Sequence, residues 1–240
     1  MTAGARHVGR RAVIVAVSGL DGAGKSSQVR LLETALREHG IDAAREWVPV
    51  AYDASIERAK RRANAVLRAL HLRPTLAPPR ESALPRPDTE LTPGKALVRK
   101  STVARQLWMT FIALTNVVSH WRSLLRHRGG SVVIFDRYTL DSAVRLHAWY
   151  GHLGSVGVQS WLVRTLSPRP FRAYLLDVDP EIAYARRPGQ WEVDELRRQA
   201  ALYRANAAKY QVRRLDGERP VAELAAEIAA DVHAGLTARR

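Results

Sequence analysis

The stretch that decides the fold is AVIVAVSGLDGAGKSS, residues 12–27. It opens with a short run of small and β-branched apolar side chains, which is typical of a buried parallel strand. From residue 26 to residue 39 the apolar side chains recur at helical spacing. Between the expected strand and helix, residues 19–26 fit the pattern G-x-x-x-x-G-K-[S/T]. This context predicts a phosphate-binding loop.

Each residue type in this loop has a physical use. Glycines let backbone N–H groups turn inward around phosphate oxygens, and the helix N-terminus adds a favourable dipole. Lys25 is expected to reach the β- and γ-phosphates, and the Ser26 hydroxyl is expected to hold Mg²⁺. We therefore predict a site for ATP and Mg²⁺ made by Gly19, Gly22, Ala23, Gly24, Lys25, Ser26 and Ser27.

Further apolar runs extend this pattern outward from the loop. They cover residues 41–47, 132–135, 171–178 and 212–215, and a final helix is expected over 221–238. Strands that alternate with helices predict βαβ units and an α/β fold, with a parallel sheet and helices on both of its faces.

Residues 73–93 interrupt the alternation, because six of them are proline. This density of proline excludes a helix or a central strand. Strands of the expected sheet lie on both sides of the segment, so we interpret it as an excursion of one domain spanning residues 1–240. A basic helical pattern precedes it at 56–72, and a long helix is expected at about 95–128.

Composition excludes several classes of protein. The 240 residues include no cysteine, which excludes thiol catalysis, disulfide frameworks and Cys-based metal sites. The 38 basic and 23 acidic residues give a net charge of +15, which favours polyanionic partners in general. The sequence has no apolar run long enough to span a membrane and no signal peptide, so we expect a cytoplasmic protein.

A second candidate element is FDRY at 135–138, which directly follows an apolar run. An acidic residue at the end of a buried parallel strand lies at the carboxyl edge of the sheet, where ligands bind in open α/β folds. Asp136 is therefore expected near Ser26 and the metal, with Arg137 directed at the transferred phosphate or the acceptor phosphate.

These segments together resemble the thymidylate kinase family. The matching pieces are GLDGAGKSS at 19–27, Arg45-Glu46, FIAL at 111–114, FDRY at 135–138 and LLDVDPEIAYARR at 175–187. The resemblance implies a three-layer P-loop NTPase fold with a five-stranded parallel sheet. It also implies transfer of the γ-phosphoryl of ATP to a nucleoside monophosphate such as dTMP. The sequence is compatible with a homodimer and gives no firm indication of a nucleic-acid partner.

The resemblance also implies roles on the acceptor side. Asp21 would approach the acceptor sugar, Arg45 and Arg137 would grip the acceptor phosphate, and Phe111 would stack on the base. Thr115 stands where the family has an arginine that reads the base. A threonine cannot supply a forked pair of charged donors. We therefore expect weak discrimination between bases.

A short arginine-bearing lid is implied at residues 186–192. Arg186 and Arg187 are candidates for stabilising charge in the transition state, together with Lys25 and Arg137. The helix before the lid is expected to begin at Asp179-Pro180, a capping residue followed by a proline at the first helical position.

Two other functions remain open at this point. A deoxynucleoside kinase shares the phosphate-binding loop and needs a carboxylate after its second strand as general base, a part that Glu46 could play. A non-catalytic, nucleotide-regulated module would instead use the basic segment 56–72 to bind nucleic acid or a membrane surface.

Overall fold

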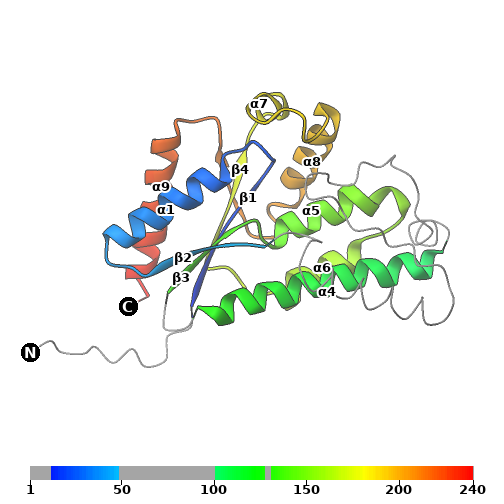
Figure 1. The fold of residues 1–240 in the computed structure, drawn as a ribbon, viewed down its shortest axis with the longest axis horizontal. Helices are drawn as coiled ribbons and strands as arrows, with labels where there is room; N and C mark the ends of the chain where they lie inside the picture. Colours follow the sequence, from blue (N-terminus) through cyan, green and yellow to red (C-terminus); the bar gives the residue numbers. More distant parts are fainter. Residues whose placement is uncertain (1–11, 49–100, 128–130, 240) are drawn as a thin grey trace, which may run out of the picture.

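The computed structural model describes residues 12–48, 101–127 and 131–239. In this part of the chain the fold is α/β, with a five-stranded sheet in the order β2-β3-β1-β4-β5 (Figure 1). All four neighbouring pairs are parallel, which confirms the expected α/β fold with a parallel sheet. The proline-rich segment 73–93 and the basic segment 56–72 lie outside the described residues.

The strands coincide closely with the apolar runs in the sequence. They are β1 (Val13–Gly19), β2 (Ala43–Trp47), β3 (Val132–Asp136), β4 (Arg172–Asp177) and β5 (Arg213–Asp216). β1 lies in the middle and pairs with β3 and β4, with Val17 opposite Asp136 and Gly19 opposite Leu176. Because the strands are parallel, their carboxyl ends meet at one edge of the sheet, next to residues 20–24.

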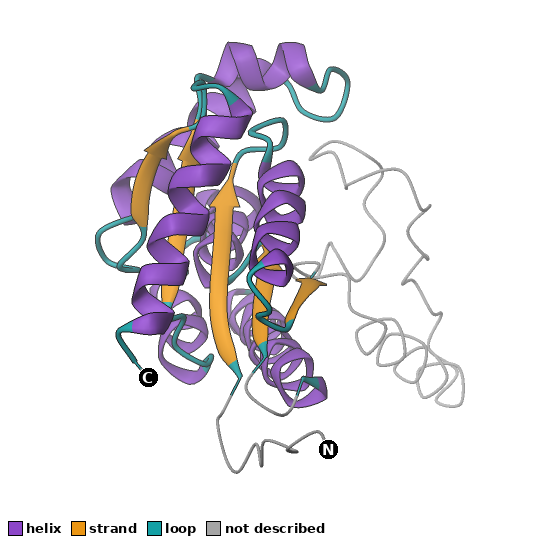
Figure 2. Cartoon of the chain, turned by 90° about the vertical axis from the view of Figure 1, so that its left-hand side faces the viewer, coloured by secondary structure: helices purple, strands orange, loops and turns teal. Residues whose placement is uncertain are grey.

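Helices lie on both sides of the sheet (Figure 2). α1 and α9 pack together on one face, and α4 and α5 lie on the other (Figure 1). The helices are α1 (Lys25–Glu38), α4 (Thr102–Arg126), α5 (Thr139–Tyr150), α6 (Gly157–Leu166), α7 (Pro180–Arg186), α8 (Val193–Asn206) and α9 (Val221–Thr237), with a 3-10 turn at Gly151–Leu153.

The core explains why β1 is apolar along its whole length. Val15 and Val17 belong to the cluster that includes the buried side chains of α1. Ile14 and Ala16 point to the other face, in a cluster against which Leu124 of α4 packs. Since successive side chains of a strand alternate between faces, a strand covered by helices on both sides needs apolar residues at every position.

The helix α7 begins as its sequence predicts. Asp179 is the N-cap and its side chain accepts a hydrogen bond of 2.9 Å from the backbone N–H of Glu181, and Pro180 is the first helical residue. This cap fixes where the chain turns after β4, so that α7 lies beside the loop that follows β1.

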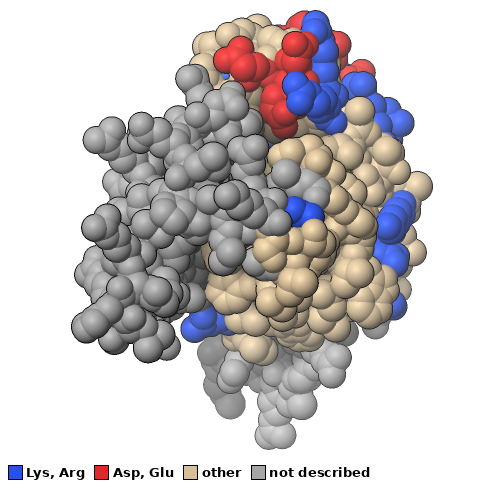
Figure 3. Space-filling view, turned by 90° about the vertical axis from the view of Figure 1, so that its right-hand side faces the viewer, with Lys and Arg blue, Asp and Glu red and all other residues tan. Residues whose placement is uncertain are grey.

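One side of α4 exposes a stripe of large apolar side chains. No lysine, arginine, aspartate or glutamate stands between Arg105 and Arg122. None of the helices in the described ranges is both long and apolar enough for a membrane span. On the face shown in Figure 3, the acidic side chains of the described residues gather at the top together with several basic ones, and the described surface below is mostly tan, with a few basic groups. The exposed stripe consists of Val103, Leu107, Leu114, Val118, Trp121 and Leu125.

The loop after β1 packs tightly against the backbone of α7. A Cβ atom added to Gly22 would lie 2.2 Å from the carbonyl oxygen of Ala183, and the φ angle of Gly22 is +91°. Gly24 has a similar φ angle of +86°, but a Cβ atom there would meet nothing within 4 Å. Glycine is therefore required at position 22 by both contact and conformation, and at position 24 by conformation alone.

We predict that Gly22→Ala lowers the free energy of unfolding by more than about 3 kcal/mol, because the new methyl group must displace the backbone of α7. Gly24→Ala is the matched control and should cost only about 1–2 kcal/mol of left-handed strain. Urea denaturation measures both values. Equal losses in the two variants would contradict the close approach of α7 to the loop.

Candidate functional site

The loop between β1 and α1 turns through two glycines in the left-handed region of backbone conformation. Gly22 and Gly24 both have positive φ angles, and the N–H of Ala23 donates to the carbonyl of Leu20 at 3.1 Å. Gly24 is the N-cap of α1, and no side-chain hydrogen bond from the described residues caps that helix. The first N–H groups of α1 therefore lack a capping side chain, and an anion at this helix terminus would satisfy them.

Lys25 folds back under this loop. Its Nζ atom donates to the carbonyl of Leu20 at 2.6 Å, and the residue is only 5% exposed. Burial disfavours the charged form and lowers the pKa of Lys25 to about 8. The ammonium is thus held in a place where water stabilises it poorly, so a nearby negative charge would be strongly favoured.

Four other charged groups act on the ammonium of Lys25. The carboxylates of Asp141 and Asp136 raise its pKa, whereas the guanidinium groups of Arg145 and Arg187 lower it. Two cations that converge on a third repel it unless an anion lies between them. This cluster of cations is therefore suited to a polyanionic group such as a chain of phosphates.

The two arginines of the expected lid differ in position. α7 ends at Arg186 and α8 begins at Val193, so the lid predicted at 186–192 is a turn over 187–192, and Arg186 belongs to the helix. Arg186 donates from Nη1 to the carbonyl of Gly217 at 3.3 Å. Arg187, by contrast, is close enough to Lys25 to lower its pKa.

The expected metal-binding pair is brought together. The hydroxyl of Ser26 donates to Oδ2 of Asp136 at 2.5 Å, at the carboxyl end of β3. Burial raises the pKa of Asp136, and the Ser26 hydrogen bond and the charge of Lys25 oppose that shift. The described residues contain no group of three His, Cys, Asp or Glu side chains able to hold a metal. Two oxygen ligands fit Mg²⁺, which keeps several waters or takes phosphate oxygens.

Asp21 is more heavily engaged than the sequence suggests. It is 6% exposed and forms an ion pair through Oδ1 with Arg137. Its Oδ2 atom accepts a hydrogen bond of 2.9 Å from Nε1 of Trp191 and lies 3.9 Å from a guanidinium nitrogen of Arg145. Asp21 thus orients three donors around the loop, whereas the resemblance implies a contact with the acceptor sugar.

Arg137 is held in an unusual backbone conformation. Its φ angle is +79°, a value that residues other than glycine rarely adopt. Its backbone N–H donates to the carbonyl of Val17 on β1 at 3.0 Å, and its guanidinium pairs with Asp21 and, at 3.7 Å, with Asp141. Strained residues of this kind persist where the surroundings fix them, and they cluster at functional sites.

Sequence reasoning missed four residues that complete this network. Asp141 is fully buried, and it accepts hydrogen bonds from the backbone N–H of Tyr138 at 2.9 Å and the hydroxyl of Tyr203 at 2.8 Å. A signal was available for two of them, because positions 137, 141 and 145 are four apart and alternate in charge. The four residues are Asp141, Arg145, Trp191 and Tyr203.

Arg45 lies near the Ser26–Asp136 pair, on β2. It forms an ion pair with Glu33 of α1 and is half exposed. It also lines a pocket of about 440 Å³ that reaches Ser26 and Asp136. Arg45 on β2 therefore shares a pocket with Asp136, whereas the guanidinium of Arg137 pairs with Asp21 and Asp141.

Glu46 is engaged by the end of α4. Its carboxylate accepts from the hydroxyl of Ser123 at 3.1 Å and from Nη2 of Arg126 at 2.9 Å, and it contacts Nε2 of His127 at 2.7 Å. A general base needs a free lone pair directed at the acceptor. Two partners on α4 and His127, which directly follows the helix, leave Glu46 poorly suited to that part.

Phe111 and Thr115 make their contacts within α4. The ring of Phe111 stacks on Trp108 at 5.7 Å between centroids, and the Thr115 hydroxyl donates to the carbonyl of Ile112 at 2.8 Å. Phe111 adjoins the exposed stripe, on the opposite side of the helix from the buried Met109 and Asn116. Their expected roles at the acceptor base stay predictions.

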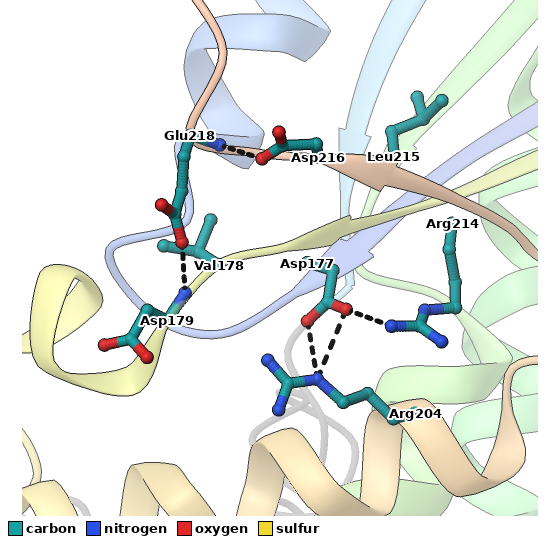
Figure 4. A pocket seen from close by; sticks show the side chains of 8 residues that line it. All are labelled: Asp177, Val178, Asp179, Arg204, Arg214, Leu215, Asp216 and Glu218. Atoms are coloured by element: carbon teal, nitrogen blue, oxygen red, sulfur yellow. Dashed lines mark hydrogen bonds and ion pairs between the residues drawn. The ribbon is translucent and has the colours of Figure 1, made fainter.

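A second pocket, also of about 440 Å³, lies at the carboxyl ends of β4 and β5 (Figure 4). Asp177 pairs there with Arg204 at 2.9 Å and with Arg214 at 2.5 Å. Glu218 accepts from the backbone N–H of Asp179 at 2.9 Å. The residues that line this pocket include four carboxylates and two guanidinium groups, so its formal charge is negative, which does not suit a phosphate chain.

Comparison of the sequence with protein-family models and with curated proteins finds no match. The likeness to thymidylate kinases therefore rests on the quoted motifs. The chemistry of the site is the basis on which a function can be argued.

The lowered pKa of Lys25 predicts how stability depends on pH. Between about pH 8 and 10.5 the unfolded chain still binds the proton that the folded chain has released, so stability rises with pH. Relative to Lys25→Met, the wild type should gain up to about 3 kcal/mol over this range. Below pH 8 the wild type bears the full cost of burying the ammonium, and Lys25→Met should be more stable.

Urea unfolding of the two proteins at pH 7, 8, 9 and 10 measures the difference between their stabilities. A difference that stays constant over this range would contradict the burial of a charged Lys25.

Proposed function

We propose that the chain is an ATP-dependent phosphotransferase of the P-loop kinase type, which transfers the γ-phosphoryl group of ATP to a nucleoside monophosphate. The observation that supports it best is the buried ammonium of Lys25 inside a glycine loop, next to the Ser26–Asp136 pair. A buried cation, uncapped helical N–H groups and two oxygen ligands for Mg²⁺ are the donor set that a triphosphate chain requires.

The loop also has space for a phosphate group, in addition to the electrostatic attraction. The space on the Cβ side of Gly24 is open, so a phosphate can approach the backbone there. Lys25 and the first turn of α1 would bind the phosphate oxygens, and Ser26 and Asp136 would hold Mg²⁺. When bound, the metal supplies positive charge that offsets the charge of the phosphates.

The remaining charged residues support the transfer step. An oxygen of the acceptor phosphate attacks the γ-phosphorus, and the bond to the oxygen that bridges the β- and γ-phosphates breaks, so that ADP leaves. Arg187 and Lys25 would stabilise the charge on the transferred group and the leaving oxygen. Arg137 and Arg45 would hold the acceptor phosphate, for which a guanidinium group offers two parallel hydrogen bonds.

The engaged carboxylates favour a phosphorylated acceptor over an unphosphorylated nucleoside. A phosphate monoester is already largely ionised at neutral pH and needs no general base, whereas a sugar hydroxyl does. Glu46 is engaged by α4, Asp21 by two arginines and Trp191, and Asp136 by Ser26. Thr115 is bonded to its own helix, so we propose broad selectivity among the acceptor bases.

We further propose a homodimer that pairs the exposed stripe of α4 with its counterpart in a second copy. Antiparallel pairing keeps the two sets of Arg122 and Arg126 apart, since they lie at the same end of each helix. Exposed apolar residues of α6 (Val158, Trp161 and Leu166) enlarge the surface toward the roughly 800 Å² per partner of a standard interface.

A screen of ADP release tests the proposed function. We expect turnover with ATP, Mg²⁺ and one or more nucleoside monophosphates, and little with unphosphorylated nucleosides. Lys25→Ala should reduce turnover at least about 10³-fold, whereas Lys209→Ala, an exposed lysine, should not change it. More than a tenth of wild-type turnover in folded Lys25→Ala, or turnover with nucleosides alone, would contradict the proposal.

The two neighbouring arginines at the end of α7 provide a matched pair. Arg187→Ala should lower kcat by about 10²-fold, because Arg187 acts at Lys25. Arg186→Ala should lower kcat less than about tenfold, because Arg186 is bonded to the carbonyl of Gly217. Steady-state kinetics with ATP and the best acceptor measure both. A larger loss in Arg186→Ala would mean that the two roles are reversed.

Light scattering of the purified chain tests the homodimer. We expect the molar mass of two copies at micromolar concentration, and that of one copy for Leu114→Glu, which places a charge in the middle of the stripe. Leu31→Glu, at an exposed leucine of α1, is the control and should leave two copies. A wild-type mass of one copy would exclude this pairing.

A further inference from the structure

The turn between α7 and α8, residues 187–192, is linked to the phosphate-binding loop by one side chain. Nε1 of Trp191 donates to Oδ2 of Asp21 at 2.9 Å, across 170 positions of sequence. Among the described residues this is the side-chain hydrogen bond that joins the turn to the loop. Trp191 is partly buried against the main core cluster, whereas residues 187–189 are exposed.

Asp21 connects this turn to the acceptor side of the site. Its Oδ1 atom pairs with Arg137, and its Oδ2 atom accepts from Trp191 and lies 3.9 Å from Arg145. A carboxylate that is 6% exposed depends on its partners, because a lost hydrogen bond to a buried charge is not replaced by water. Movement of Trp191 would therefore change how strongly Asp21 holds Arg137.

The backbone of the turn is compatible with such movement. Pro188 follows the end of α7, and Gly189 has a φ angle of +81° with open space where a Cβ atom would lie. Arg187 in the same turn repels the ammonium of Lys25. The turn is thus held near a cation of like charge, and the indole hydrogen bond opposes the repulsion.

We propose that Trp191 is a positioning residue that holds the turn 187–192 against the phosphate-binding loop through Asp21, and that it thereby couples the position of Arg187 to that of Arg137. The hydrogen-bonded link stands on the geometry alone, and its catalytic consequence rests on the proposed function. A phosphate chain bound between Arg187 and Lys25 offsets their repulsion and stabilises the position that the turn has in the structure.

Hydrogen exchange of the ligand-free chain tests the link without any substrate. Trp191→Phe retains the apolar packing and removes the indole N–H. We expect about tenfold faster exchange of amides in both 187–192 and 20–24, the scale of one lost hydrogen bond to a charged group. Tyr210→Phe, which removes the hydrogen bond of 3.1 Å from the Tyr210 hydroxyl to the carbonyl of Ser160, is the control and should change neither segment. Unchanged exchange at 20–24 in Trp191→Phe would overturn the proposal.

Tryptophan fluorescence with Mg²⁺–ATP tests the response to a ligand, with calorimetry to measure binding independently. Wild type and Tyr210→Phe should show a change in emission that Trp191→Phe lacks. An identical change in all three proteins while ATP is bound would overturn the proposal. Absence of ATP binding to all three would instead overturn the proposed function, and the exchange experiment would still decide whether Trp191 links the turn to the loop.

Discussion

The ammonium of Lys25 lies under a glycine loop at the carboxyl edge of the sheet, where burial lowers its pKa to about 8. A cation in such a place is stable only if the surrounding groups supply negative charge or hydrogen-bond acceptors. The carbonyl of Leu20 and the carboxylates of Asp136 and Asp141 do so in part. Much of the remaining architecture can be understood as support for this arrangement.

The sheet order brings the required carboxylates to the loop. Because β3 pairs with β1, Asp136 lies beside Val17, and the chain continues from there through Arg137 into α5, which contains Asp141. On the other side, β4 pairs with β1 and leads into α7, which packs on the backbone of Gly22. Two segments far apart in the sequence therefore converge on one loop, and Trp191, in the turn after α7, adds a hydrogen bond to it.

The sequence predicts those parts of the fold and site whose signals are local. The apolar run at 12–17, the glycine loop and the Asp179-Pro180 cap each depend on neighbouring residues, and the structure contains all three. Trp191 gave no such signal, because its partner Asp21 lies 170 positions away and a tryptophan in a turn is compatible with simple packing. The hydrogen bonds and ion pairs of Asp21 and Glu46 could not be predicted from the sequence either, because they depend on how the helices pack on the sheet.

The central claim is that the buried ammonium of Lys25 binds a phosphate chain. The uptake of protons when Mg²⁺–ATP binds tests this claim most directly. At pH 8.5 an ammonium whose pKa is about 8 is mostly deprotonated, and a bound polyphosphate should raise that pKa. Calorimetric titration of Mg²⁺–ATP in buffers of different ionisation enthalpy should therefore show uptake of roughly 0.7 proton per site by the wild type. Lys25→Met should show none. A binding enthalpy of the wild type that is independent of the buffer, or no binding at all, would contradict the account.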